Sequence, residues 1–181
     1  MNMKKEFLTH EITPLTMAVL AHKDENGKVI SHVLEERGDY YVDQRPSDLI
    51  DDACIYFGAD LQGRQVGTNR ISGYAHKLPI SIDPGSGMYF LPTASPSNPS
   101  CSWIGHSHIY KLQQHKEMQT KLIFNNGLAI VLDVSYGSML NQVNRTAQYR
   151  FVLDSRIKNL PPRNPNPYNP YNPFKSFEPF E

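Results

Sequence analysis

The sequence has 181 residues, of which 39% are hydrophobic and 20% charged, and this composition is typical of a globular protein with one main domain. No apolar run approaches the roughly 18 residues of a membrane-spanning helix, and the N-terminal residues lack the apolar stretch of a secretory signal. We therefore expect a cytoplasmic protein without a membrane partner. The only two cysteines, Cys54 and Cys101, are too few for a disulfide framework, and we expect both to be reduced.

The net charge of zero hides an uneven distribution along the chain. Residues 1–60 contain 6 Lys and Arg against 12 Asp and Glu, whereas residues 61–181 contain 12 against 6. Two stretches, 61–82 and 134–163, hold a single acidic residue between them, Asp154. Such segregation is typical of a protein that presents one face to a polyanion.

The N-terminal half predicts a β-hairpin, a third strand and a helix. The three strands are short runs of Val, Ile, Leu or Tyr at 16–22, 28–34 and 39–42. Asn26-Gly27 lies between the first two, and this pair favours the positive φ angles of a hairpin turn. Pro46 then begins a predicted helix over 46–57, which Gly58 ends. Its apolar residues, Cys54 among them, share one face.

The stretch 58–73 is interpreted as a basic connecting loop, because glycines recur along it. Gly58 and Gly63 have the spacing of a phosphate-binding loop, but the lysine and the Ser or Thr that such a loop requires are missing. The sequence therefore excludes nucleotide binding there.

The C-terminal half predicts further hairpins and a second principal helix. The predicted strands cover 78–82, 88–91, 102–109, 121–124 and 128–132. Asn125-Asn126-Gly127 gives the clearest hairpin signal of the chain. Ser138 is the predicted cap of a helix over 138–157. The residues expected to face inward are Met139, Leu140, Val143, Ala147 and Phe151, and those expected outside are Asn141, Arg145, Gln148 and Arg156.

The last 22 residues differ in composition from the rest of the chain. They contain seven of the 14 prolines and four Asn-Pro pairs, which neither a strand nor a helix accommodates. We expect an α+β domain over 1–160, built from short antiparallel strands and hairpins with two principal helices. Residues 161–181 are expected to form a Pro-, Asn- and aromatic-rich extended tail.

The sequence offers one pair of residues with metal-site geometry. His106 and His108 are one residue apart in a predicted strand and would project from the same face. The alternative function is therefore a metal-dependent enzyme, or a structural zinc protein in which these histidines join Cys54, His76 and Cys101. The carboxylate and the Cys-x-x-Cys pair of known metal enzymes are absent from the expected positions. We expect no catalytic residue, no cofactor and no bound metal.

The basic half resembles the ComK family of competence transcription factors. The resemblance covers roughly residues 15–158 and depends on the order and spacing of several short motifs. These are Gly63-Arg64 with Gly67-Thr68, His76-Lys77-Leu78-Pro79-Ile80, Asp83-Pro84, Phe90-Leu91-Pro92-Thr93, Cys101-Ser102-Trp103-Ile104-Gly105-His106-Ser107-His108, Phe124-Asn125-Asn126-Gly127, Ser135-Tyr136, Asn141-Gln142-Val143 and Arg145-Thr146-Ala147.

The resemblance implies an activator of DNA-uptake genes that binds A/T-rich boxes through the minor groove as paired dimers. Narrow A/T tracts concentrate negative potential, so a few Arg or Lys side chains suffice to bind them. Charge and position give the candidate DNA-binding residues, which are Arg64, Arg70, Lys77, Asn141, Gln142, Arg145, Thr146, Arg150 and Arg156. Trp103 is expected to be a core residue that does not stack on DNA.

The tail departs from the family pattern, because its Asn-Pro-Tyr repeats replace the usual C-terminal segment. In relatives that region also binds an adaptor that delivers the activator to a Clp protease. A Clp-protease adaptor is therefore a further expected partner, alongside double-stranded DNA and a second copy of the chain.

Overall fold

The computed structural model of the chain describes residues 12–159. The Pro-rich tail, with the expected adaptor contact and the domain boundary at 160, lies outside these residues. The strands are β1 Thr16–Lys23, β2 Val29–Glu35, β3 Gly38–Val42, β4 Ile80–Asp83, β5 Met88–Pro92, β6 Trp103–Gly105, β7 Ile109–Lys116, β8 Gln119–Phe124 and β9 Ala129–Leu132. The helices are α1 Pro46–Tyr56, α2 Leu61–Ser72 and α3 Tyr136–Lys158, with a 3₁₀ turn at His106–His108.

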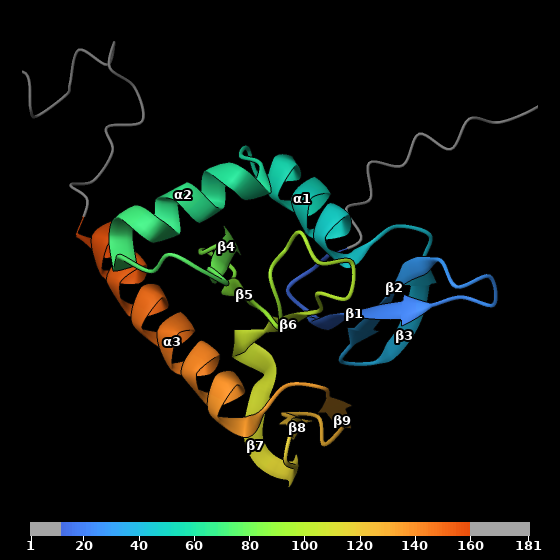
Figure 1. Cartoon of the computed structure of the whole chain (residues 1–181). Coiled ribbons are helices and arrows are strands. Elements are labelled where there is room, and N and C mark those ends of the chain that lie inside the picture. Colours follow the sequence, from blue (N-terminus) through green and yellow to red (C-terminus); the bar gives the residue numbers. More distant parts are fainter. Residues whose placement is uncertain (1–11, 160–181) are drawn as a thin grey trace, which may run out of the picture.

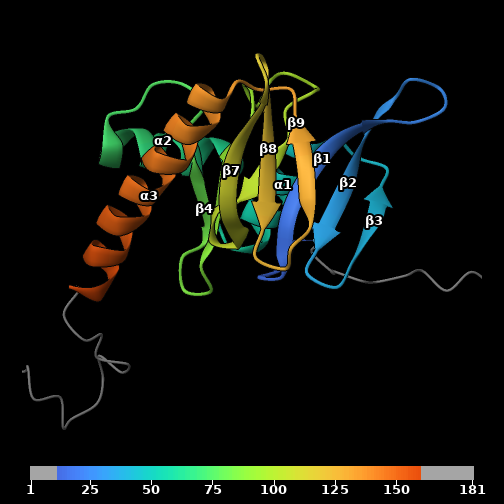
Figure 2. The same cartoon turned by 90° about the horizontal axis from the view of Figure 1, so that it is seen from below.

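The strands form two antiparallel sheets that stack on each other. The larger sheet has the order β3-β2-β1-β6-β5-β4, and the smaller has the order β7-β8-β9. Helices α1 and α2 cover one face of the larger sheet, and the smaller sheet lies across its other face (Figure 1, Figure 2). Helix α3 runs along the side, against α2, β5 and β7. The expected α+β class, with short antiparallel strands, is confirmed.

Strand alternation divides the apolar residues of the larger sheet between two cores. Val19 and Trp103 point toward α1 and α2, whereas their chain neighbours Ala18 and Ile104 point toward the smaller sheet. The smaller sheet contributes Leu122 and other inward residues to the second core. The inner strands of the larger sheet, such as β5 and β6, are thus buried on both faces, and the smaller sheet is buried on one face only.

The predicted hairpins are confirmed. Gly27 and Gly127 have φ angles of 77° and 87°, which L-residues with a Cβ rarely adopt, and each lies in the turn between two paired strands. The helix predicted over 46–57 is also confirmed as α1, with Cys54 fully buried on its inner face. Burial raises the pKa of the Cys54 thiol to about 12, so this thiol stays protonated.

The prediction of a connecting loop over 58–73 is wrong, because helix α2 occupies most of it. Asp60 caps this helix by accepting a hydrogen bond from the Gly63 N–H, at 2.6 Å. The Asp51 carboxylate of α1 accepts another from the Leu61 N–H, at 2.7 Å. Gly73, in the left-handed region, ends the helix. These hydrogen bonds at its ends stabilise α2, although its interior glycines lower its helix propensity.

No helix in the described part of the chain combines the length and the hydropathy needed to cross a bilayer.

Candidate nucleic-acid interface

Helix α3 carries six of the nine predicted DNA-binding residues, and its orientation differs from the prediction. The cap is Ser135, whose hydroxyl accepts a hydrogen bond from the Ser138 N–H, and Ser138 lies inside the helix. The buried residues are Met139, Gln142, Thr146 and Tyr149. Three residues that were expected to face inward are exposed instead: Leu140 is 39% exposed, Phe151 is 74% exposed, and Ala147 is exposed as well.

Gln142 and Thr146 are buried and serve the fold. The Gln142 amide donates to the carbonyl oxygens of Lys77 and Pro92, at 3.0 and 2.9 Å. The Thr146 hydroxyl donates to the Gln142 carbonyl within the helix, at 2.7 Å. Since buried polar groups require such partners, Gln142 fixes α3 to β5 and to the loop before β4, whereas Thr146 is satisfied within the helix. Neither side chain is accessible to DNA, so we remove both residues from the candidate DNA-binding set.

Arg145 joins α3 to the loop between α2 and β4. Its guanidinium donates to the His76 carbonyl at 2.7 Å and to the Gln142 side-chain oxygen at 2.9 Å. It also lies over the Tyr74 ring, 4.2 Å from the ring centre. Arg145 was expected on the outer side of the helix, but its side chain lies half-buried between two parts of the fold and its charge takes part in their packing.

Two further predicted arginines are engaged in the structure. Arg64 donates to the Phe57 carbonyl at the end of α1, at 2.9 Å. Arg150 donates to the Ser107 hydroxyl at 2.8 Å and lies over the Tyr89 ring, 5.1 Å from its centre. Its Nε is also 3.7 Å from an oxygen of Asp154. Both side chains have partial exposure, and one terminal nitrogen of each already donates to an acceptor of the protein.

The remaining four predicted residues are exposed: Arg70, Lys77, Asn141 and Arg156. Arg70 ends α2, Lys77 lies in the loop before β4, and the other two are near opposite ends of α3. None of the three cations among them forms an ion pair with a described residue. They remain available to a phosphate, although the structure does not gather them into one cluster.

The two histidines of the metal hypothesis do not converge. Strand β6 ends at Gly105, where an added Cβ would lie 2.9 Å from the Thr16 carbonyl oxygen, and the chain then enters the 3₁₀ turn. The prediction of one strand over 102–109 is wrong at this point. His108 lies 2.9 Å from the Pro14 carbonyl oxygen and 3.5 Å from Glu36, whereas His106 lies near Arg150 of α3. Burial, and secondarily Arg150, lowers the pKa of His106.

No group of three or more His, Cys, Asp or Glu within residues 12–159 is arranged to hold a metal ion. Cys54 and Cys101 belong to the core beneath α1, and His76 is exposed in the loop after α2. The five residues of the zinc alternative are therefore not brought together.

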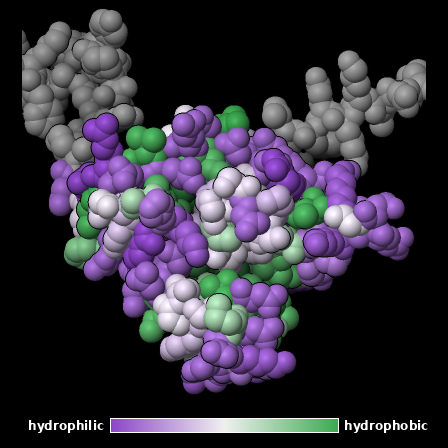
Figure 3. All heavy atoms as spheres, in the orientation of Figure 1, coloured by the Kyte–Doolittle hydropathy of each residue, from purple (hydrophilic) through white to green (hydrophobic). Residues whose placement is uncertain are grey.

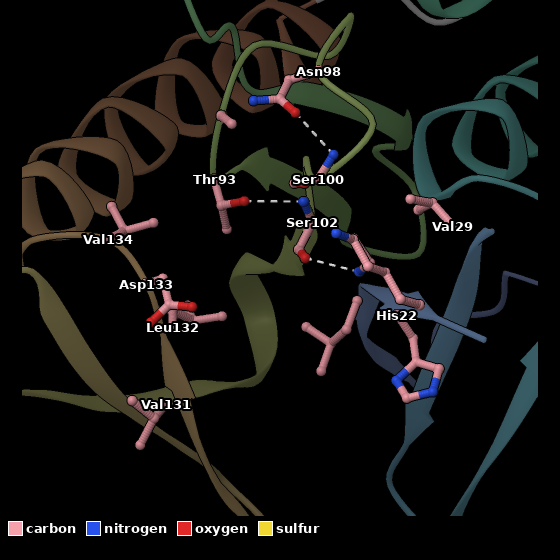
Figure 4. A pocket seen from close by; sticks show the side chains of 14 residues that line it. His22, Val29, Thr93, Asn98, Ser100, Ser102, Val131, Leu132, Asp133 and Val134 are labelled. Atoms are coloured by element: carbon pink, nitrogen blue, oxygen red, sulfur yellow. Dashed lines mark hydrogen bonds between the residues drawn. The ribbon is translucent and has the colours of Figure 1, made fainter. Parts of the chain in front are cut away.

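A hollow between β1, β9 and the loop after β5 has a volume of about 430 Å³. It is lined by histidine, serine and aspartate side chains, the residue types of a hydrolytic active site. Of the two serines that line it, Ser102 is engaged, because its hydroxyl accepts a hydrogen bond from the Ala21 N–H at 2.9 Å. Figure 4 shows His22 and Asp133 on different sides of this hollow. No described histidine is therefore paired there with a nucleophile or an acid.

The observations so far define an α+β domain of two stacked antiparallel sheets and three helices, in which cations outnumber acids after residue 60. Residues 7–158 match the family model described as ComK protein. The Competence transcription factor of Bacillus subtilis strain 168 is 34% identical over 155 residues, which cover 86% of this chain and 80% of that relative. The chain therefore belongs to the ComK family, and the matches place it among regulators of transcription in competence. No solved structure matches it.

Proposed function

We propose that this protein activates competence genes by binding A/T-rich duplex DNA through the minor groove. The observation that carries this proposal is the one-sided distribution of charge in the folded domain. Residues 12–60 contain four Lys and Arg against ten Asp and Glu, whereas residues 61–159 contain ten against four. In Figure 1 the acidic segment, β1 to β3 and α1, lies to the right, and α2, α3 and β7 lie to the left and below.

A neutral protein with this arrangement attracts a polyanion on one side and repels it on the other. Since each phosphate contact releases counterions, even a few cations on the basic side give salt-dependent binding. The minor groove of an A/T tract requires few of them, because its own narrowness concentrates negative potential. The family membership supports DNA as the polyanion.

The test compares the binding of the full chain to three duplexes of the same length. One is A/T-rich, one has its A·T pairs replaced by inosine–cytosine pairs, and one is G/C-rich. Inosine–cytosine pairs reproduce the minor groove of A·T and the major groove of G·C. We expect fluorescence anisotropy to show equal affinity for the first two duplexes and weaker affinity for the third. Equal affinities for the second and third duplexes would contradict minor-groove binding.

We also propose that a second copy of the chain covers the exposed side of α3. Leu140, Asn144, Ala147 and Phe151 recur there with the 4-3-4 spacing of a helix-pairing seam. Phe151 borders an apolar groove of about 570 Å³ that α3 forms with the end of α2. A two-fold pair of α3 helices would place the same stripe on both sides of the interface, as isologous dimers do.

Phe151→Ser should therefore convert dimers into monomers in analytical ultracentrifugation, because the most exposed apolar side chain of the stripe is lost. Its melting temperature at low concentration should be close to that of the wild type, since the side chain is 74% exposed. Ile55→Ser, at a 55% exposed position on α1, is the matched control and should leave the dimer intact. A Phe151→Ser dimer as tight as the wild-type dimer would sink this assignment.

A further inference from the structure

The outer face of the smaller sheet is a cationic surface that the sequence prediction missed. On β8, Thr120, Leu122 and Phe124 are buried toward the larger sheet, so Gln119, Lys121 and Ile123 point outward. Figure 2 views this sheet from outside, with the larger sheet behind it and no described element in front. Figure 3 shows the lower end of the molecule, which these strands form, as mostly hydrophilic with paler residues between.

The register of the three strands fixes which residues share this face. Residues directly opposite each other in an antiparallel pair lie on the same face. Lys121 pairs with Gln113 of β7 and with Val131 of β9, and these three form the central row. The flanking rows are Lys111, Ile123 and Ala129 on one side, and Lys116 with Gln119 on the other. We name these eight residues the β7–β9 face.

The charge of the β7–β9 face is entirely positive. Lys111, Lys116 and Lys121 form no ion pair with a described residue. Residues 109–133 contain two acids, Glu117 in the turn after β7 and Asp133 directly after β9. Neither belongs to the eight residues, but Asp133 lies at the edge of the face beside Gln119. Asp133 accepts a hydrogen bond from the Gln119 amide at 2.7 Å.

The other residues of the β7–β9 face are either apolar or glutamines, whose uncharged amide groups can donate hydrogen bonds. Val131 is 47% exposed, and Ile123 and Ala129 occupy the adjoining row. The Gln113 amide lies between Lys111 and Lys116 along β7. The face thus combines apolar side chains and amide donors with three lysines, which suits the floor of an A/T minor groove, because that floor presents only acceptors and sugar edges. The cations would then meet the phosphates on either side.

We propose that the β7–β9 face is the surface that lies on the DNA minor groove, with Gln113 in its central row over the base edges and the long side chains of Lys111, Lys116 and Lys121 extending to the phosphates. This inference deepens the proposed function and rests on it. Three strands span about 10 Å, which exceeds the roughly 6 Å width of an undeformed minor groove. The bound groove must therefore open, and the flexible TA steps of A/T-rich DNA permit this at low cost.

The decisive experiment compares two variants of the full chain, each of which adds one negative charge at a different position. Gln113→Glu places a carboxylate in the central row of the β7–β9 face, opposite Lys121, so the sheet retains a favourable cross-strand pair. Gln62→Glu places the same charge on the exposed first turn of α2. We expect Gln113→Glu to weaken binding to the A/T-rich duplex by about tenfold or more, and Gln62→Glu by less than about twofold.

A second pair of variants separates the sheet from the helices. Lys111→Gln with Lys121→Gln should lower the slope of log affinity against log salt by about two, because two phosphate contacts are lost. Arg70→Gln with Lys77→Gln removes two exposed cations from α2 and its following loop and should change this slope less.

The outcomes distinguish this inference from the proposed function. Wild-type protein that does not prefer A/T-rich DNA would contradict the proposed function itself. Wild-type preference together with equal effects of Gln113→Glu and Gln62→Glu would overturn only the assignment of the surface. If the sheet variants bind DNA normally but no longer activate transcription, the β7–β9 face serves a protein partner, and the inference is also overturned.

Discussion

Trp103→Ala should lower the free energy of unfolding by about 3 to 5 kcal/mol, the largest single effect we expect in this fold. Trp103 is fully buried in β6, a central strand of the larger sheet, and pairs with Val19 of β1 and Pro92 of β5. Its indole N–H donates to the Ser47 hydroxyl of α1 at 3.1 Å. Removing the ring leaves a cavity between α1 and the sheet, which thermal unfolding followed by far-ultraviolet circular dichroism would measure.

Two milder variants keep this prediction testable if Trp103→Ala does not fold. Ser47→Ala removes only the hydrogen-bond acceptor and should cost about 1 kcal/mol. Trp103→Phe retains a ring and should lie between Ser47→Ala and Trp103→Ala. Trp103 is the only tryptophan, so the unfolding of Ser47→Ala can be followed by its fluorescence alone. A Trp103→Ala variant with wild-type stability and impaired DNA binding would show that Trp103 stacks on DNA.

The hairpins and α1 were predictable because their signals are local. An Asn-Gly pair determines its own turn, and Pro46 begins a helix whatever surrounds it. Helix α2 gave a weaker signal, since Gly63 and Gly67 lower its propensity. Its stabilisation comes partly from Asp51 on another helix, a contact that the sequence pattern does not reveal.

The buried face of α3 was mispredicted because part of it is polar. The hydrophobic pattern favoured Leu140 and Phe151 as inward residues, whereas Gln142 and Thr146 occupy the core side. Gln142 is buried there because carbonyl groups of Lys77 and Pro92, distant in sequence, accept its amide protons. A glutamine followed four residues later by a threonine indicates nothing by itself, and only the tertiary contacts determine this face.

Strand β7 was not predicted because its alternation is interrupted. Its pairing with β8 shifts between Ile109 and Lys111 and again between Gln114 and Lys116. Between these shifts only Leu112 supplies an inward apolar residue. The cationic surface was missed for the same reason, since Lys111 and Lys121 lie on one face only after the register of β7 and β8 is known.

Arg145→Ala should lower the free energy of unfolding by about 2 kcal/mol. We expect this loss of stability, and not a change in DNA affinity, to be its main effect. The guanidinium makes two charge-assisted hydrogen bonds, and a bond to a charged group contributes about 1.5 to 3 kcal/mol. We count only the bond to the buried Gln142 in full, because His76 is exposed and water can replace the other. One partner, the Gln142 side chain, is itself buried. Its oxygen would therefore lose its hydrogen-bond donor, and water would not replace it. Thermal melting of Arg145→Ala beside the exposed Arg156→Ala would measure the effect, and Arg156→Ala should change stability by less than about 0.5 kcal/mol.

Arg145→Lys separates this structural role from contact with DNA. Lysine keeps the charge, but a single ammonium does not reproduce the planar fork that spans His76 and Gln142 while it covers the Tyr74 ring. If Arg145 holds the loop to α3, Arg145→Lys should lose most of the stability that Arg145→Ala loses. If Arg145 instead contacts a phosphate, Arg145→Lys should restore both affinity and salt slope, and Arg145→Ala should melt at the wild-type temperature. Melting and anisotropy measured on the same three proteins decide between the two roles, because a loop clamp depends on the shape of the guanidinium and a phosphate contact depends on its charge.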